Sequence, residues 1–201
     1  MKVIGIGGGS GSGKSTLCYS LMDTYSETFS IIHLDDYQKH KNDPTIPKSA
    51  GVINWDHPDT INWSALLSDI AKLKEGESVA ISSWSHRDNV DYFAHGKMMD
   101  YTIYPKSLIL LEGYLALWNA ELLQMYDRTY FLEADQDIRM ARRDKFADPL
   151  YEEKILTPMH NEYVEPSKQN ADVVIDVSAS DAVAVHESVK DDLDEVFKFI
   201  S

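Results

Sequence analysis

The stretch Gly8 to Ser15, which reads GGSGSGKS, constrains the fold of this chain more than any other part of its sequence. It fits the pattern G-x-x-x-x-G-K-[ST], with the apolar run Lys2 to Ile6 before it and the helix-like segment Lys14 to Tyr25 after it. In this context glycines allow successive backbone N–H groups to point at phosphates, and the start of the helix adds positive charge. We therefore expect a nucleoside triphosphate on this loop rather than a glycine-rich turn that binds nothing.

The residues of the loop have different expected tasks. The Lys14 ammonium would reach the β- and γ-phosphates, and the Ser15 hydroxyl would ligate Mg²⁺, so ATP and Mg²⁺ are the expected cofactors. The residues expected to bind the nucleotide are Gly8, Gly9, Ser10, Gly11, Ser12, Gly13, Lys14, Ser15 and Thr16.

Apolar runs that alternate with helix-like segments predict the rest of the fold. Besides Lys2 to Ile6, the expected strands are Phe29 to Leu34, Ser107 to Gly113, Arg128 to Ala134 and Ala171 to Val177. Further helices are expected over Thr60 to Lys74 (with Thr60 or Asp59 as cap), Asp135 to Phe146 and Asp181 to Ile200. Continuous apolar strands indicate a parallel sheet that is covered on both faces. The prediction is one three-layer α/β domain over residues 1–201.

Residues 78–104 interrupt this alternation. Two short alternating segments, SVAISSW and KMMDYTIY, flank a polar link, which predicts a β-hairpin insertion over one edge of the sheet.

The overall composition excludes several classes of partner. With 33 acidic and 19 basic residues the net charge is -14, which disfavours non-specific binding to nucleic acid. The single cysteine, Cys18, allows no internal disulfide and suits a reducing compartment. Neither a signal peptide nor an apolar stretch of about 20 residues is evident. We expect a cytoplasmic protein with a small-molecule partner and no membrane contact; the composition leaves a homo-oligomer open.

Three classes of nucleotide-binding protein compete at this point: a small-molecule kinase, a GTPase and a motor ATPase. The D-x-x-G and N-K-x-D elements typical of GTPases are absent from the sequence. A motor ATPase is usually longer and acts on a polymer, which the acidity of this chain disfavours. A kinase needs a base, a metal-binding acid and a cationic lid.

Carboxylates follow two of the expected strands. Asp35 and Asp36 stand at the carboxyl end of Phe29 to Leu34, where ligands of parallel sheets bind, and Asp35 could act as base and help hold the metal. Glu112 ends a strand resembling a Walker B element and is the expected metal ligand. The structural alternative is a helix cap, a solvated turn or an acid that merely ends a strand.

Three arginines cluster in DIRMARR: Arg139, Arg142 and Arg143. Helical spacing places them on two adjacent faces, where they could bind phosphates and stabilise charge during transfer. The alternative is salt bridging to Asp135 or Asp137.

Together these motifs resemble the uridine kinase and phosphoribulokinase family of P-loop kinases. The resemblance covers Ile4 to about Asp176. It rests on GGGSGSGKST, LDDY, NWDHPD, LLEGYLAL, DIRMARR and PMHNEYVEPSKQNADVVI, in the family's order.

This resemblance implies roles for several residues. Asp35 would be the base for a ribose 5′-hydroxyl, and Asp56 would bind the 2′- and 3′-hydroxyls. Tyr37 of LDDY and His86 on the hairpin would also contact the substrate, His86 through the base. Glu112 matches the metal-site acid, and the three arginines fall in a lid region over residues 139–158.

The sequence also departs from the family. The lid is short and lacks an Arg-Gly-Arg segment, and the hairpin lacks a tyrosine near the base, where Trp84 could stack instead or pack in the core. Trp63 is expected in the core. The leading hypothesis is ATP-dependent phosphorylation of a nucleoside 5′-hydroxyl, with uridine or cytidine as acceptor. Nicotinamide riboside kinases, which share the short lid, are the nearest alternative, and a non-catalytic nucleotide-binding regulator is the alternative from another class.

Overall fold

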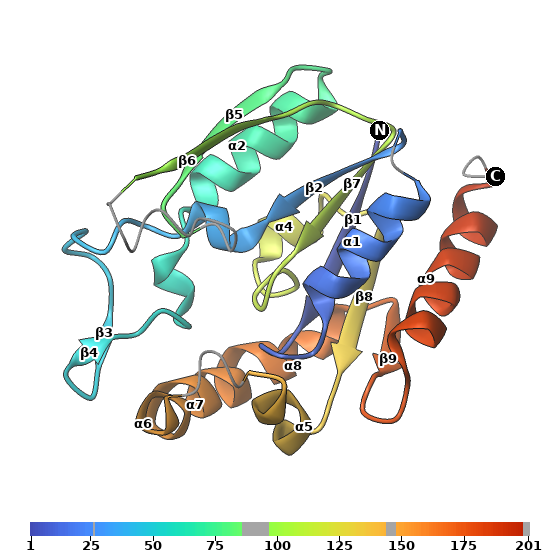
Figure 1. Cartoon of the computed structure of the whole chain (residues 1–201). Coiled ribbons are helices and arrows are strands. Elements are labelled where there is room, and N and C mark those ends of the chain that lie inside the picture. Colours follow the sequence, from blue (N-terminus) through green and yellow to red (C-terminus); the bar gives the residue numbers. More distant parts are fainter. Residues whose placement is uncertain (26, 86–96, 144–147, 199–201) are drawn as a thin grey trace.

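The structure, a computed structural model, describes residues 1–25, 27–85, 97–143 and 148–198 (Figure 1). Its centre is a parallel sheet with the strand order β2-β7-β1-β8-β9. The strands are β1 (Lys2–Gly8), β2 (Phe29–His33), β7 (Leu108–Glu112), β8 (Arg128–Glu133) and β9 (Val173–Asp176). All five lie where the apolar runs predict strands, and the three-layer α/β architecture is confirmed.

The register of the sheet gathers polar residues at one edge. In parallel pairing, Glu112 at the end of β7 lies opposite Ile6 of β1 on one side and opposite His33 of β2 on the other. The loop that follows β1 and the residues that follow β2 therefore leave the sheet beside Glu112.

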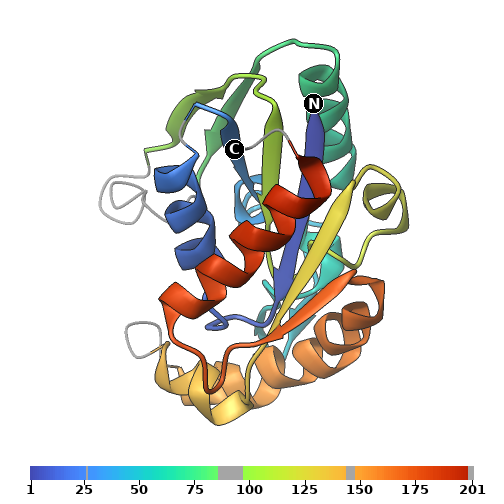
Figure 2. The ribbon, with the colours of Figure 1, turned by 90° about the vertical axis from the view of Figure 1, so that its right-hand side faces the viewer.

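Side chains of the strands alternate between two hydrophobic cores. On β7, Leu108 and Leu110 belong to the core under α1 (Lys14–Thr24) and α9 (Ala182–Phe197). Ile109 and Leu111 belong to the core under α2 (Trp63–Lys74) and α4 (Ala120–Leu123). Figure 2 shows α1 and α9 side by side on their face of the sheet. Because both faces are covered, the strands read as continuous apolar runs.

Two antiparallel pairs lie outside the sheet. β5 (Val79–Ser83) pairs with β6 (Met99–Ile103) within the predicted hairpin region. β3 (Lys48–Ser49) pairs with β4 (Val52–Ile53) in the long connection between β2 and α2.

Two predicted helices have different bounds. α2 begins at Trp63, and its cap is Asn62, whose side chain accepts a bond from the Ala65 N–H at 3.3 Å. The predicted caps Thr60 and Asp59 lie instead in a separate 3-10 turn, Pro58–Thr60, because extended Ile61 separates the two elements. α5 (Gln136–Ala141) is shorter than the predicted Asp135 to Phe146, and residues 144–147 lie outside the described residues.

A long helical run over residues 149–170 was not predicted. It consists of α6 (Pro149–Tyr151), α7 (Thr157–Met159) and α8 (Glu165–Ser167), with the π-helical turns Glu152–Leu156 and His160–Val164 between them and the 3-10 turn Lys168–Asn170 at its end. Pro158 and Pro166 lack the N–H that an ordinary helical turn requires, and each follows one of the wide turns. Figure 1 shows this run below the carboxyl ends of the strands.

Among the described residues, no helix has the length and apolar character required to cross a bilayer.

Candidate active site

The backbone of the loop between β1 and α1 has the conformation that only glycine adopts easily. Gly11 and Gly13 have φ angles of 84° and 94°, and a Cβ on Gly11 would lie 2.4 Å from the carbonyl oxygen of Arg139. The Ser12 N–H donates to the Gly9 carbonyl at 3.1 Å, which closes the turn. Gly13 is the N-cap of α1, so the loop opens directly onto the positive end of that helix.

Lys14 lies folded back into this loop. Its Nζ donates to the Gly9 carbonyl at 3.0 Å, and the side chain is buried. Burial lowers the pKa of the Lys14 ammonium, while the nearby carboxylates of Glu112 and Asp35 oppose that shift. Burial makes the charged form of this side chain costly, and an anionic ligand on the same loop would offset that cost.

Glu112 is the buried acid beside the loop. Its Oε1 accepts hydrogen bonds from the Ser15 hydroxyl at 3.1 Å and from His33 Nδ1 at 2.7 Å. Burial alone would raise the pKa of Glu112, but the His33 hydrogen bond and the Lys14 charge hold it below its usual range. Burial likewise opposes the charged form of His33, yet the bond to Glu112 raises the pKa of the imidazole.

His33 was not assigned a role from the sequence. The available signal was its position directly before LDDY, but only the strand register shows that it faces Glu112.

Asp35 follows β2 in the 3-10 turn Leu34–Tyr37. The residue is exposed, and its backbone carbonyl accepts a bond from the hydroxyl of Ser85, two residues after the end of β5. Desolvation by the surrounding protein and the charge of Glu112 raise the pKa of Asp35 to about 7, against the opposing charge of Lys14. The carboxylate therefore changes protonation state near neutral pH, as a general base does.

The side chains of the two residues after Asp35 make hydrogen bonds within the protein. Asp36 accepts a hydrogen bond from the Tyr101 hydroxyl of β6, which attaches the hairpin to this turn. Tyr37 is buried in the core under α2, and its hydroxyl donates to Asp69 at 3.2 Å. The geometry therefore gives no support to the predicted substrate contact of Tyr37, because the ring after LDD packs inward.

The oxygen donors at this edge fit a magnesium ion. Ser15, Glu112 and Asp35 offer a hydroxyl and two carboxylates beside the phosphate loop. Within the described part of the chain, no group of three or more His, Cys, Asp or Glu side chains forms a metal cage. Mg²⁺ needs none, since it commonly binds one or two carboxylates together with substrate phosphates and water.

The three arginines are divided between two sides of the loop. Arg139 is buried, and a Cβ on Gly9 would lie 2.7 Å from its Nη1. Arg143 donates to the Ser10 hydroxyl and lies 3.6 Å from Glu152. Arg139 and Arg143 thus cover the phosphate loop, whereas Arg142 is turned away.

Arg142 lines a cavity of about 240 Å³ on the other side of the loop. Its Nη2 donates to the Val177 carbonyl at 3.0 Å, and Gly13 and Thr16 also border the cavity. A nucleotide with its phosphates on the loop could place its base in this cavity.

His160 is a second residue that the sequence reasoning missed. In the helical run 149–170 its Cε1 would lie 2.9 Å from a Cβ on Gly9, so it covers the loop beside Arg139. Burial and the Arg139 charge lower the pKa of His160 to about 4, which keeps the imidazole neutral. Its only sequence signal was its place in the motif PMHNEYVEPSKQN.

The loop with Asp56 is fixed by side-chain contacts. Buried Asn54 donates to Ser49 and accepts from the Asp56 N–H at 3.2 Å. Tyr151 of α6 connects two neighbouring positions: its hydroxyl accepts from the Trp55 N–H at 3.0 Å and donates to Asp56 Oδ2 at 2.7 Å. Burial raises the pKa of Asp56, while the Tyr151 bond and the Arg143 charge oppose the rise.

Two tryptophan rings are in contact between the Asp56 loop and the hairpin. The ring of Trp55 lies 4.9 Å from that of Trp84, centroid to centroid, and the Trp84 indole donates to the Gln38 carbonyl at 3.2 Å. Trp63 packs against the core as predicted and donates to the Pro58 carbonyl at 2.9 Å. The predicted base contact His86 lies outside the described residues.

Comparison with known proteins identifies one family. The family model "Phosphoribulokinase / Uridine kinase family" matches residues 3–184. The uridine kinase of Chlamydia pneumoniae is 34% identical over 188 residues, which cover 87% of this chain and 81% of the relative. That of Halobacterium salinarum is 31% identical over 194 residues, covering 91% of this chain and 83% of the relative.

Solved structures share the fold at lower identity. A protein described as a possible uridine kinase from Bacillus stearothermophilus has a TM-score of 0.61 and 20% identity, with 87% of this chain and 88% of that chain covered. The shikimate kinase of Acinetobacter baumannii, in complex with shikimate, has a TM-score of 0.52 and 16% identity, covering 98% and 94%.

Proposed function

Because the chain belongs to the phosphoribulokinase and uridine kinase family, it is an ATP-dependent small-molecule kinase, and we propose that its acceptor is a nucleoside. Uridine and cytidine are the first acceptors to test, since the relatives named above are uridine kinases. The reaction would give a nucleoside 5′-monophosphate and ADP.

One observation carries this proposal: at one edge of the sheet, Lys14 folds into the phosphate loop and Ser15 of the loop donates to Glu112, while Asp35 follows the strand paired with the Glu112 strand. Arg143 connects this edge to Asp56, since it contacts Ser10 of the loop and its charge acts on Asp56. A group bound to Asp56 would thus lie near phosphates held on the loop.

In the proposed mechanism Asp35 accepts the proton of the acceptor's 5′-hydroxyl. The hydroxyl oxygen then bonds to the γ-phosphorus, and the bond between that phosphorus and the bridging oxygen of ADP breaks. Lys14, Arg139 and Arg143 neutralise the charge on the phosphates. Asp56 binds the 2′- and 3′-hydroxyls, because one carboxylate can accept from both members of a vicinal diol. Mg²⁺, held by Ser15 and Glu112 with Asp35 near it, would neutralise phosphate charge.

The test is acceptor-dependent formation of ADP. The protein is incubated with ATP–Mg²⁺ and, separately, uridine, cytidine, nicotinamide riboside, pantothenate or ribulose 5-phosphate. ADP and a nucleoside monophosphate formed only with uridine or cytidine would support the proposal. Turnover with another acceptor would replace the substrate, and binding of ATP without transfer to any acceptor would favour a regulator.

A further inference from the structure

Buried polar atoms without a hydrogen-bond partner lie at the phosphate loop. Among the residues that the structure describes, Arg139 Nη1, His160 Nδ1 and Ser12 Oγ are buried and neither donate nor accept a hydrogen bond. Buried polar groups normally have partners in a folded protein, because leaving one without a partner is costly. A ligand bound on the loop would supply the missing partners.

His160 and Arg139 meet the loop at the same residue. A Cβ on Gly9 would lie 2.7 Å from Arg139 Nη1 and 2.9 Å from His160 Cε1, the ring atom bonded to Nδ1. The carbonyl of Gly9 also accepts the hydrogen bond of the Lys14 ammonium at 3.0 Å. Burial, the Arg139 charge and the Lys14 charge all lower the pKa of His160, as expected for a ring close to both cations. The ring therefore lies at the end of the loop where Lys14 would reach the β- and γ-phosphates.

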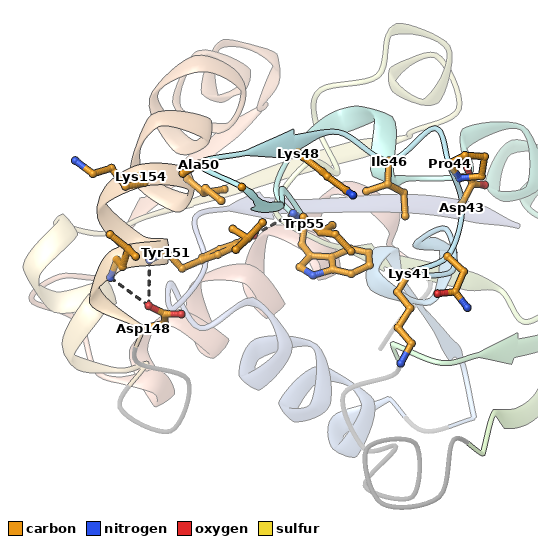
Figure 3. A pocket seen from close by; sticks show the side chains of 16 residues that line it. Lys41, Asp43, Pro44, Ile46, Lys48, Ala50, Trp55, Asp148, Tyr151 and Lys154 are labelled. Carbon is orange, nitrogen blue, oxygen red and sulfur yellow. Dashed lines mark hydrogen bonds between the residues drawn. The ribbon is translucent and has the colours of Figure 1, made fainter.

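The helical run that carries His160 is fixed at its start. Asp148 caps α6 by accepting hydrogen bonds from the Leu150 and Tyr151 N–H groups at 3.2 and 3.1 Å (Figure 3). The Tyr151 hydroxyl then joins the run to the Asp56 loop through its bond of 2.7 Å to the carboxylate. These contacts restrict the movement of the run relative to that loop.

A fixed carboxylate lies beside the other nitrogen of the His160 ring. Nε2 is 3.7 Å from Glu165 Oε2, which is longer than a hydrogen bond. Glu165 accepts from Lys168 at 2.6 Å, and Lys168 also donates to Glu133 of β8 at 2.6 Å. Because Nε2 is not hydrogen-bonded to Glu165, the neutral ring can carry its proton on Nδ1, where it is a donor for a ligand.

We propose that His160 is a phosphate-contacting residue, whose Nδ1–H donates to the terminal phosphate of ATP beside Arg139 Nη1. The proposal rests on the proposed function only in that ATP binds on the loop; it does not depend on the nature of the acceptor. A donor placed at the phosphoryl group that leaves ATP stabilises charge on that group during transfer.

Nucleotide affinities measured without an acceptor test the proposal. Isothermal titration calorimetry on the full chain with Mg²⁺ compares ADP with the non-hydrolysable ATP analogue β,γ-imido-ATP, which carries the terminal phosphate. His160→Phe keeps a ring and removes Nδ1. We expect it to weaken binding of the analogue about tenfold and to leave ADP within about twofold, because one hydrogen bond to a charged group is lost.

Two further variants separate a lost donor from disturbed packing. The amide nitrogen of His160→Asn can take the place of Nδ1, so this variant should bind the analogue within about threefold of wild type. Asn161→Phe places the same ring at the neighbouring exposed position and should change neither affinity. An equal loss for ADP and the analogue in His160→Phe would overturn the proposal, as would an unchanged affinity for the analogue or an Asn variant no better than the Phe variant.

The ¹⁵N resonance of His160 Nδ1 gives a second measurement on the unaltered chain, which holds even where His160→Phe does not fold. The resonance is assigned by its loss in His160→Asn. It should move when the analogue is added and move less with ADP, and a resonance that the analogue leaves in place would contradict the hydrogen bond. Because no acceptor is present, a failure of the proposed nucleoside specificity would not alter these outcomes.

Discussion

The phosphate loop and the loop that carries Asp56 both present polar groups to the proposed transfer centre, but different interactions hold them. Backbone conformation fixes the phosphate loop: Gly11 and Gly13 have positive φ angles, and buried Lys14 donates to a carbonyl within the loop. Side-chain contacts across the chain fix the Asp56 loop, above all the Tyr151 hydroxyl.

This difference has a consequence for substitutions. A change on the phosphate side removes charge from where phosphates bind, and it should therefore lower the rate of transfer. A change on the Asp56 side alters a recognition contact or the packing behind it, and should appear in acceptor affinity or in stability.

The largest effect in this comparison is expected for Lys14→Met, which removes the buried cation of the phosphate side. We expect kcat to fall by about 10²–10³-fold, since one lost stabilising group costs that much in preorganised sites. The unfolding midpoint should not fall, because burial already disfavours the Lys14 charge. Steady-state kinetics and thermal denaturation measure the two. Lys190→Met is the control, and kcat within twofold of wild type for Lys14→Met would contradict the assigned role.

Asp56→Asn tests the acceptor side with a smaller effect. The acceptor KM should rise about 10- to 100-fold through loss of a charged hydrogen-bond acceptor, while the KM for ATP stays unchanged. Asp59→Asn, an exposed acid three residues further on, is the matched control. A parallel loss for ATP and acceptor would mean that Asp56 has a structural role.

The dependence of kcat/KM on pH tests the role of Asp35 as general base. The pKa of Asp35 is raised to about 7, so its proton-accepting form is present above that pH and is lost as pH falls. We expect kcat/KM for the acceptor to fall about tenfold per pH unit well below pH 7. A profile that is flat between about pH 5 and 8 would remove Asp35 as the essential base.

The smallest effect is expected for Tyr151→Phe. Loss of the hydroxyl leaves the Trp55 N–H and Asp56 without that partner, so the free energy of unfolding should drop by about 1 kcal/mol. Urea denaturation measures it, with Tyr104→Phe, 64% exposed on the hairpin side, as control. The KM for ATP should not change. A raised KM for ATP without a loss of stability would contradict the proposed separation between the phosphate loop and the Asp56 loop.

Local sequence signals were sufficient to locate the phosphate loop and the acid beside it. The loop pattern places Lys14 and Ser15, and the apolar strand before Glu112 locates that acid at a strand end. These features depend on residues close together in the chain, or on strand ends that meet at one edge in any parallel sheet.

The sequence reasoning failed where a contact joins distant segments. His33 meets Glu112 only through the β2–β7 register, and Tyr151 meets Asp56 across 95 positions. The substrate contact of Tyr37 stays a prediction; its ring packs in the core under α2, an orientation that its position after two acids does not indicate.

The helical run 149–170 was missed for a different reason. Asp148 followed by Pro149 is a helix-start signal that the sequence analysis did not use. Two prolines and two π-helical turns within the run then disturb the apolar spacing on which helix prediction depends.

The central claim is that Asp35 takes the acceptor's proton beside phosphates held by the Lys14 loop. The most direct test is the single-turnover rate of Asp35→Asn with ATP–Mg²⁺ and the acceptor that the panel identifies, alongside binding of both substrates. We predict a rate about 10²–10⁴-fold below wild type with both substrates still bound. A variant that transfers phosphate at the wild-type rate would contradict the account.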